Sequence, residues 1–222
     1  MITEADENYL KEIYTLELDY EHVTTSMLAD CFGYSPATVT GMLKKLANLD
    51  WVVYEPYRGV NLTETGRAIA LEVIRHHRLL ETYLVQALNI PWDRVHEEAD
   101  RLEHALSEYL EERIDELLGH PTTDPHGSPI PSLNGQILNS LRLRLADLSL
   151  GDHAEIIEVN DHNPELLTHL DQLQLHPLVQ IKVTAVEPID GLITILASGQ
   201  THILGQTSAS QIIVKKLNAT QK

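Results

Sequence analysis

Thiols are scarce in this sequence of 222 residues, which contains a single cysteine, Cys31. A disulfide needs two thiols, so the chain cannot form one internally. Proteins without disulfides are at home in a reducing compartment, and we expect a cytoplasmic location.

Long apolar runs are also absent from the sequence. No stretch approaches the ~18 apolar residues that cross a bilayer. The acidic start, MITEADE, lacks the apolar core of a secretory signal, and we expect no membrane segment. The 43% hydrophobic and 22% charged residues are typical of a globular protein, and the length allows two or three small domains.

Cationic side chains are few, with 16 Lys and Arg against 33 Asp and Glu and a net charge of −17. This balance argues at first against a nucleic-acid partner, because phosphate contacts need Lys and Arg. Residues 34–67 are an exception, with four cationic and three anionic side chains. Elsewhere carboxylates gather with histidines, a combination of ligand types that binds divalent cations.

Apolar periodicity, caps and turn residues predict a helical first half. Residues 24–26 and Ser35 are placed to cap helices, Pro36 follows in a first turn, and Gly33 ends the helix between them. The expected elements are helices at residues 6–18, 27–31 and 36–49, strands at 51–54 and 60–62, and helices at 63–89 and 91–118, the last with a break near its start.

The composition changes after residue 118. Residues 120–131 contain four prolines and Gly127, which predicts a tether. Short β-like runs follow at residues 154–159, 179–186, 192–196 and 211–217, with a helix at 166–173. This order is typical of a small β-barrel. We expect a mainly α fold with β, in three domains spanning residues 1–63, 64–141 and 142–222.

The order helix, tight turn, helix and hairpin over residues 23–62 is that of a winged helix-turn-helix. Small and hydroxylated residues on one face of its second helix suit close approach to the major groove. The alternative is a hairpin of helices that only packs, with its lysines solvated. The residues expected to contact DNA are Ser35, Ala37, Thr38, Thr40, Gly41, Lys44, Lys45 and, at the hairpin tip, Arg58.

The segment VHEEADRLEH carries the strongest local indication of a metal site. His96, Asp100, Glu103 and His104 follow the spacing i, i+4, i+7 and i+8, which places them on one face of a helix. Such a stripe of imidazoles and carboxylates fits Mn²⁺, Fe²⁺ or Zn²⁺. The alternative is a solvated acidic face with surface salt bridges.

A second pair, His77 and Glu81, lies at i and i+4 in the preceding helix. Packing of the two helices would bring both sets into one cluster. The stretch from His96 to Asp100 is also close to the HExxH motif of zinc peptidases, with Glu97 as the base. A metal-dependent hydrolase is therefore an alternative, as are a metal-independent winged-helix regulator and a metal-storage protein.

Taken together, these motifs resemble the iron- and manganese-dependent repressors of the diphtheria toxin repressor family, over essentially the whole chain. The resemblance implies a metal-activated transcriptional repressor of metal homeostasis that binds a palindromic operator as a homodimer, with a C-terminal SH3-like (FeoA-like) domain. It is carried by the segments ENYLKEIYTL, RGVNLTETGR, RHHRLLETYL, RVHEEADRLEHALS, DPHGSPIP and NPELLTHL.

The resemblance also implies two metal sites. Each is a set of side chains from separate segments. The first maps onto Asn8, Asp100, Glu103 and His104, and the second onto His77, Glu81 and His96 with Glu158 and Asp161. A manganese-sensing branch of the family draws ligands from the tether, which here adds Asp124 and His126 to Glu81 and Asp161.

Three departures from the family pattern concern the first site, one of them Asp100, where family members often have Cys or Glu. Asn8 offers a neutral amide oxygen, and Lys11 replaces a glutamate that manganese sensors use. The second site is the richer one. The absence of sulfur ligands favours Mn²⁺ over Fe²⁺, with Zn²⁺ or Co²⁺ as substitutes in vitro. We expect the dimer to use apolar residues after the wing, such as Leu84, Leu88, Leu106 and Leu110.

Overall fold

The structure is a computed structural model that describes residues 2–137, 142–187, 189 and 191–217. It divides into two compact units, each described here by itself. The first comprises Met1–His76, Glu103–Ala105 and Pro131–Gln136, and the second comprises His77–Leu102, Leu106–Ile130 and Ile137–Lys222. Residues 138–141, where the second expected domain ends, and residues 218–222 lie outside the described part.

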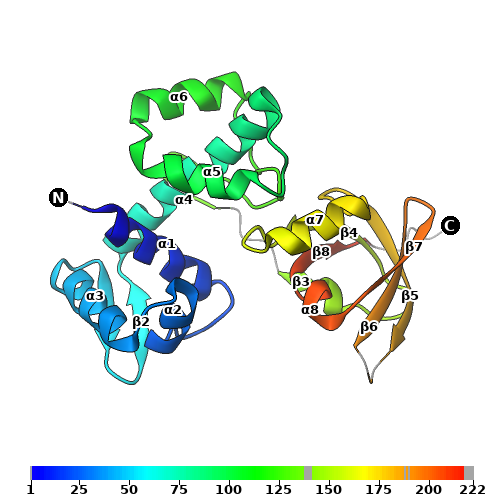
Figure 1. Cartoon of the computed structure of the whole chain (residues 1–222), viewed down its shortest axis with the longest axis horizontal. Helices are drawn as coiled ribbons and strands as arrows, with labels where there is room; N and C mark the ends of the chain where they lie inside the picture. The colour runs from blue at the N-terminus through cyan, green and yellow to red at the C-terminus, as the bar shows by residue number, and fades with distance from the viewer. Residues whose placement is uncertain (1, 138–141, 188, 190, 218–222) are drawn as a thin grey trace. The chain divides into compact units, whose positions relative to one another are not determined.

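The first unit contains the predicted winged helix-turn-helix (Figure 1). Thr24 caps the second helix, Gly33 ends it with a φ of 65°, and Ser35 caps the third, as the sequence predicts. The elements are helices α1 (Glu4–Glu17), α2 (Thr25–Phe32) and α3 (Pro36–Asn48), strands β1 (Val52–Glu55) and β2 (Gly59–Leu62), and the first part of α4 (Glu64–Leu88).

Apolar side chains from each of these helices form the core of the first unit. Leu10 of α1, Leu28 of α2 and Leu43 of α3 are fully buried. The wing is tied to the segment before α2, because the amide of Val60 donates to the carbonyl of Val23 at 2.9 Å. One apolar face of α3 is thus used in packing, and the opposite face is exposed.

The segment after α4, in which Glu103–Ala105 belongs to the first unit and the remainder to the second, differs from the predicted helix over residues 91–118 with a break near its start, because the interruption lies in the middle of that range. Helix α5 (Val95–Leu102) is followed by a 3₁₀ turn, η1 (Glu103–Ala105), and then by α6 (Glu108–Leu117). The chain is extended at Leu106, and the hydroxyl of Ser107 accepts from the amide of Leu110 to cap α6. A serine that bonds the backbone locally begins a new helix there. The stripe of four expected ligands therefore does not lie on one helix.

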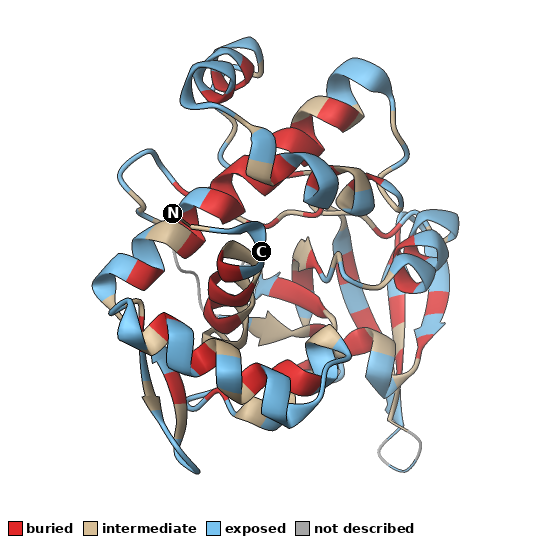
Figure 2. Ribbon diagram, turned by 60° about the vertical axis from the view of Figure 1, so that its left-hand side comes forward, coloured by how far each residue is buried: buried red, intermediate tan, exposed pale blue. Residues whose placement is uncertain are grey.

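A small apolar cluster holds the helices and the tether of this unit together. It contains Leu79 and Leu80 of α4, Ala99 of α5, Ile114 of α6 and Ile130 of the tether. Figure 2 shows buried positions interrupted by exposed ones along the helices, the pattern of amphipathic elements. The tether is therefore packed against the helices that precede it.

The second unit also contains a six-stranded antiparallel sheet in the order β3-β8-β4-β5-β6-β7. Its core includes Ile156, Leu167 and Ile195, with α7 contributing Leu167. The elements are β3 (Leu143–Arg144), η2 (Leu145–Asp147), β4 (His153–Val159), α7 (Pro164–Gln172), β5 (Gln180–Glu187), β6 (Leu192–Ala197), β7 (Gln200–Leu204), α8 (Gln206–Ala209) and β8 (Ile212–Lys216).

Strand β7 has no counterpart among the expected elements. It pairs with β6 across a two-residue turn, Ser198-Gly199, in which both residues have positive φ. Its polar His202 is buried, whereas its apolar Ile203 is 63% exposed. Because a polar residue is buried and an apolar one is exposed, the alternation of hydropathy does not predict this strand. In the part of the chain that the structure describes, none of the helices combines the length and the apolar character of a membrane-spanning segment.

Candidate metal centre

Helices α4 and α5 bring three of the expected ligands into contact. His77 and Glu81 lie one turn apart on α4, with the Nε2 of His77 3.0 Å from the Oε1 of Glu81. The Nδ1 of His96, on α5, lies 3.0 Å from that Nε2 and 3.2 Å from that Oε1. Glu81 is completely buried. The predicted meeting of the two helices occurs, and it surrounds a buried carboxylate with imidazoles.

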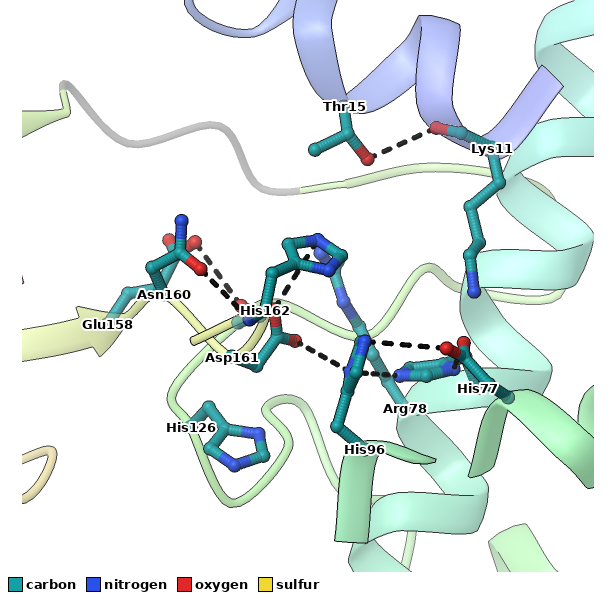
Figure 3. A network of polar contacts seen from close by, with 12 residues as sticks. Lys11, Thr15, His77, Arg78, His96, His126, Glu158, Asn160, Asp161 and His162 are labelled. Atoms are coloured by element: carbon teal, nitrogen blue, oxygen red, sulfur yellow. Dashed lines mark hydrogen bonds and ion pairs between the residues drawn. The ribbon is translucent and has the colours of Figure 1, made fainter. Parts of the chain in front are cut away.

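Asp161, in the loop after β4, completes this group. Its Oδ2 lies 3.8 Å from the Nδ1 of His96, and Figure 3 shows the two side chains directed toward each other. One ligand atom from each of His77, Glu81, His96 and Asp161 lies within 4.8 Å of the others. Two nitrogens and two oxygens at such distances could hold one divalent ion.

The tether supplies a second, overlapping group. Asp124 and His126 are buried, and they share with Glu81 and Asp161 a set of ligand atoms within 4.8 Å of one another. The Oδ1 of Asp124 accepts from the amides of His126 at 2.8 Å and Ser128 at 3.0 Å. These local hydrogen bonds fix the carboxylate and leave its second oxygen for the centre.

Three atoms of this second group are buried polar atoms with no hydrogen-bond partner among the described residues. They are the Oε2 of Glu81, the Oδ2 of Asp124 and the Nδ1 of His126. A buried polar atom without a partner costs about 1–3 kcal/mol. The Nδ1 of His126 lies 3.5 Å from the Oε2 of Glu81, so the unsatisfied atoms converge. A divalent cation between them would satisfy all three, and the residues present therefore fit a metal.

Trp92 orients His126. The Nε2 of His126 donates to the carbonyl oxygen of Trp92 at 2.7 Å, which turns the Nδ1 toward Glu81. The indole of Trp92 stacks on the imidazole with 5.5 Å between ring centroids, and it also packs against the core of the β domain. A hydrogen bond at the far nitrogen of a histidine ligand fixes its ring and raises its basicity.

The charges of the centre shift the pKa of its members. Burial raises the pKa of Glu81, but the charge of His77, the nearby His126 and the hydrogen bonds from His77 and His96 outweigh it and hold that pKa well below its usual value. Burial lowers the pKa of His126, yet its contact with Glu81 and the nearby carboxylates raise it to about 9. Burial and the charge of Glu81 raise the pKa of Asp124 to about 7. The metal-free centre therefore retains protons.

Glu158 has a different place from the one expected. It belongs to neither of the two ligand groups described above. Its Oε1 accepts from the hydroxyl of Ser128 at 3.2 Å and lies 2.9 Å from the guanidinium of Arg142. Glu158 thus holds the tether beside β4, and Asp161 is the side chain that reaches the centre.

Arg78 and Trp92 support the centre without having been predicted. Arg78 donates to the carbonyl of Pro129 at 2.5 Å, and its Nε lies 3.6 Å from the Oδ2 of Asp124. Both residues act on the tether through backbone carbonyls, for which the sequence carries no side-chain pattern. The sequence pointed to Arg78 only indirectly, because Arg78 lies in the segment RHHRLLE that carries part of the family resemblance.

The residues of the first expected site are divided between the two units. In the first unit, the Nε2 of His104 lies 2.9 Å from the Oδ1 of Asn8 and 3.4 Å from the Oε1 of Glu103. In the second unit, Asp100 contacts the histidines of the centre, at 3.2 Å from the Nδ1 of His77 and 3.5 Å from the Nε2 of His96.

The expected DNA-contacting residues lie on the exposed face of α3 and on the wing. The hydroxyl of Thr40 donates to the carbonyl of Pro36, and Lys45 forms a 2.5 Å ion pair with the buried Asp6. Arg58, at the wing tip, pairs with Glu55 at 3.1 Å and is mostly exposed. The positions exposed to solvent are Ser35, Ala37, Thr38, Gly41, Lys44, Lys45 and Arg58.

Comparison with known protein families divides the chain into three matched regions. Residues 1–60 match "Iron dependent repressor, N-terminal DNA binding domain", and residues 63–132 match "Iron dependent repressor, metal binding and dimerisation domain". Residues 143–216 match the FeoA domain. The iron-dependent repressor IdeR of Mycobacterium tuberculosis (strain H37Rv) is 30% identical, over 97% of this chain and 99% of that protein.

Solved structures resemble the whole chain as well. A manganese-dependent transcriptional repressor in complex with manganese has a TM-score of 0.91 and 36% identity, covering 96% of this chain and 100% of that one. ScaR with bound Zn²⁺ has a TM-score of 0.84 and 32% identity, covering 96% of this chain and 99% of that one. The similarity thus extends over all three matched regions.

Gly127 should be required for the tether to meet β4. A Cβ at this position would lie 1.9 Å from the carbonyl oxygen of Ile157, and its φ is +88°. We expect Gly127→Ala to lower the free energy of unfolding by about 1–3 kcal/mol and to weaken Mn²⁺ binding, because the tether must move. Gly119→Ala is the matched control, since Gly119 also has positive φ but no atom within 4 Å. Equal losses in denaturant titrations would contradict this role for Gly127.

Metal affinity should rise with pH. A group with a raised pKa keeps its proton to higher pH, and a metal ion must displace that proton. Because the pKa of His126 is raised to about 9 and that of Asp124 to about 7, we expect Mn²⁺ affinity to increase about tenfold per pH unit between pH 7 and 9, and more steeply below 7. Equilibrium dialysis at several pH values measures this slope. A flat profile over that range would contradict the assignment of His126 and Asp124 as ligands.

Proposed function

This chain belongs to the family of iron-dependent repressors, and we propose that Mn²⁺ bound around Glu81 controls its binding to operator DNA. It is a metal-dependent, DNA-binding transcriptional repressor. Residues 1–63 would read DNA, 64–141 would bind metal and form the dimer, and 142–222 would complete the metal centre through Asp161. The family consists of DNA-binding repressors, which sets aside the metal-dependent hydrolase.

One observation carries the proposal for the metal. Unsatisfied ligand atoms of Glu81, Asp124 and His126 are buried and face one another. Asp161 belongs to the same set of ligand atoms, and all four residues offer oxygen or nitrogen. Hard oxygen donors with imidazole suit Mn²⁺, with Fe²⁺ as the alternative, whereas Zn²⁺ or Co²⁺ could replace either in vitro. Glu81 and Asp161 also belong to the His77–His96 group, which makes a second ion in the same centre possible.

A divalent ion would supply positive charge among the carboxylates of this centre. The chain's own residues determine where that charge acts. Glu81 presents a carboxylate from α4, Asp124 and His126 are held in the tether by backbone hydrogen bonds, and Asp161 comes from the β domain. An ion shared by these segments favours the arrangement in which they meet. The ion can change the affinity of the chain for DNA only because it binds this arrangement more tightly than the others.

DNA reading is assigned to the exposed face of α3. In the proposal, the two α3 helices of a homodimer lie in successive major grooves of a palindromic operator. Among the residues expected in the dimer interface, Leu84 is buried and Leu106 packs within its own chain. Leu88 and Leu110 are about half exposed, and Leu117 of α6 is 70% exposed. The interface is therefore proposed for Leu88, Leu110 and Leu117.

Operator binding with and without metal tests the proposal. We expect Mn²⁺ to raise the affinity of the full chain for its own upstream DNA at least tenfold in gel-shift titrations, with Fe²⁺ and Zn²⁺ compared. Glu81→Gln should abolish this response, because it removes the charge at the centre. Glu97→Gln is the matched control, since Glu97 is an exposed acid of α5. Equal binding in chelator and in Mn²⁺ would refute the proposal, and metal binding without DNA binding would indicate a storage protein.

Lys44 should contribute to DNA binding through the phosphate backbone. It is exposed on α3, whereas the neighbouring Lys45 is paired with Asp6. We expect Lys44→Ala to weaken binding to all DNA sequences alike and to reduce the slope of log K against log salt by about 1. Lys182→Ala, at an exposed lysine of β5, is the control and should leave the slope unchanged. An unchanged slope in Lys44→Ala would remove Lys44 from the interface.

A further inference from the structure

Lys11 and Glu103 form an ion pair at the position where the family resemblance places a metal site. The Nζ of Lys11, on α1, lies 2.7 Å from one oxygen of Glu103 and 2.9 Å from the other. Glu103 is 1% exposed, and the side chain of Lys11 is 15% exposed. Both carboxylate oxygens of the expected ligand are therefore in contact with a cation that belongs to the chain.

His104, the neighbouring expected ligand, is also engaged with α1. Its Nδ1 lies 2.6 Å from the Oε2 of Glu7, and its Nε2 lies 2.9 Å from the Oδ1 of Asn8. Both ring nitrogens thus face oxygen atoms at hydrogen-bond distance. A histidine binds a metal through a nitrogen lone pair, and a nitrogen that donates to an oxygen offers none. Metal binding by His104 would require the loss of one of these contacts.

The residues at this position therefore fit a metal poorly. Asn8 is a neutral ligand, and the charge of Glu103 is already compensated. A divalent ion would have to displace a lysine ammonium from both oxygens of a buried carboxylate. Removing one member of a buried ion pair is strongly unfavourable. This contrasts with the centre around Glu81, where the described residues provide no hydrogen-bond partner for the Oε2 of Glu81, the Oδ2 of Asp124 or the Nδ1 of His126.

We propose that the ammonium of Lys11 permanently takes the place of a metal ion between α1 and η1. The position then binds no Mn²⁺, and α1 is held to Glu103–Ala105 whether or not metal is present. Activation by metal would rest on the Glu81 centre alone, a part of the inference that depends on the proposed function.

The same helix also contacts the proposed DNA-reading helix. Asp6, on α1, is fully buried and pairs with Lys45 of α3 at 2.5 Å. Asp6 is further fixed by the capping box at Thr3. Among the ion pairs of α1, the pair of Lys11 with Glu103 thus reaches η1, and the pair of Asp6 with Lys45 reaches α3. The permanent lysine would keep α3 positioned in the absence of metal.

The first test is the number of Mn²⁺ ions bound by the full chain, measured by equilibrium dialysis and elemental analysis. We expect Glu103→Gln to bind the same number as the unmodified chain, because Glu103 is not a ligand. Loss of one bound ion in Glu103→Gln would overturn the inference. Glu81→Gln is measured beside it and should lose metal. Full retention of metal in Glu81→Gln would contradict the proposed function instead, so the two failures are distinguishable.

The second test replaces the lysine. In chelator, we expect amide hydrogen exchange in α1 to be at least tenfold faster in Lys11→Gln than in the unmodified chain. Lys11→Arg should retain slow exchange, because it keeps the positive charge, and Lys182→Gln is the control for loss of a lysine. In the unmodified chain, Mn²⁺ should slow exchange in α1 no more than in α2. Unchanged exchange in Lys11→Gln, or a tenfold slowing by Mn²⁺ confined to α1, would overturn the inference.

Discussion

The carboxylate of Glu81 is completely buried, and the arrangement of α4, α5 and the tether around it depends on how its charge is compensated. A buried ionised carboxylate is stable only with positive or hydrogen-bonding partners. Its partners come from separate segments, namely His77 of α4, His96 of α5 and His126 of the tether. Three pieces of chain that differ in sequence position and local structure are therefore arranged around one charge.

Histidines alone compensate this charge incompletely, because Asp124 and Asp161 add further carboxylates. Their mutual repulsion is visible in the pKa of Asp124, which burial and the charge of Glu81 raise to about 7. Protons on Asp124 and His126 reduce the negative charge in the metal-free state. A divalent ion can replace those protons, so the negative charge of the centre can be compensated either by protons or by a metal ion.

Glu103 illustrates the opposite solution to the same physical problem. It is as buried as Glu81, but its compensating cation is Lys11, which cannot dissociate from the chain. A diffusible cation makes an arrangement conditional on its concentration, whereas a covalently attached one makes it constant. The two glutamates thus show how one chain can contain both a conditional and a constant link.

The sequence by itself determined the features that depend on local spacing. The i and i+4 positions of His77 and Glu81, the caps at Thr24 and Ser35, and the proline-rich tether all followed from residues close together in the chain. The winged helix-turn-helix was predictable for the same reason. Helical periodicity and turn geometry are short-range properties, so they can be recognised without knowing what packs against them.

Only the tertiary structure decided which of these residues meet. The break at Ser107, the assignment of Asp161 rather than Glu158 to the centre, and the pairing of Lys11 with Glu103 all arise from residues placed together by folding. Trp92 acts through its backbone carbonyl, which every residue possesses and no side-chain pattern reveals. Compensation of a buried charge depends on three-dimensional distance, and a single sequence does not contain the distances between its remote segments.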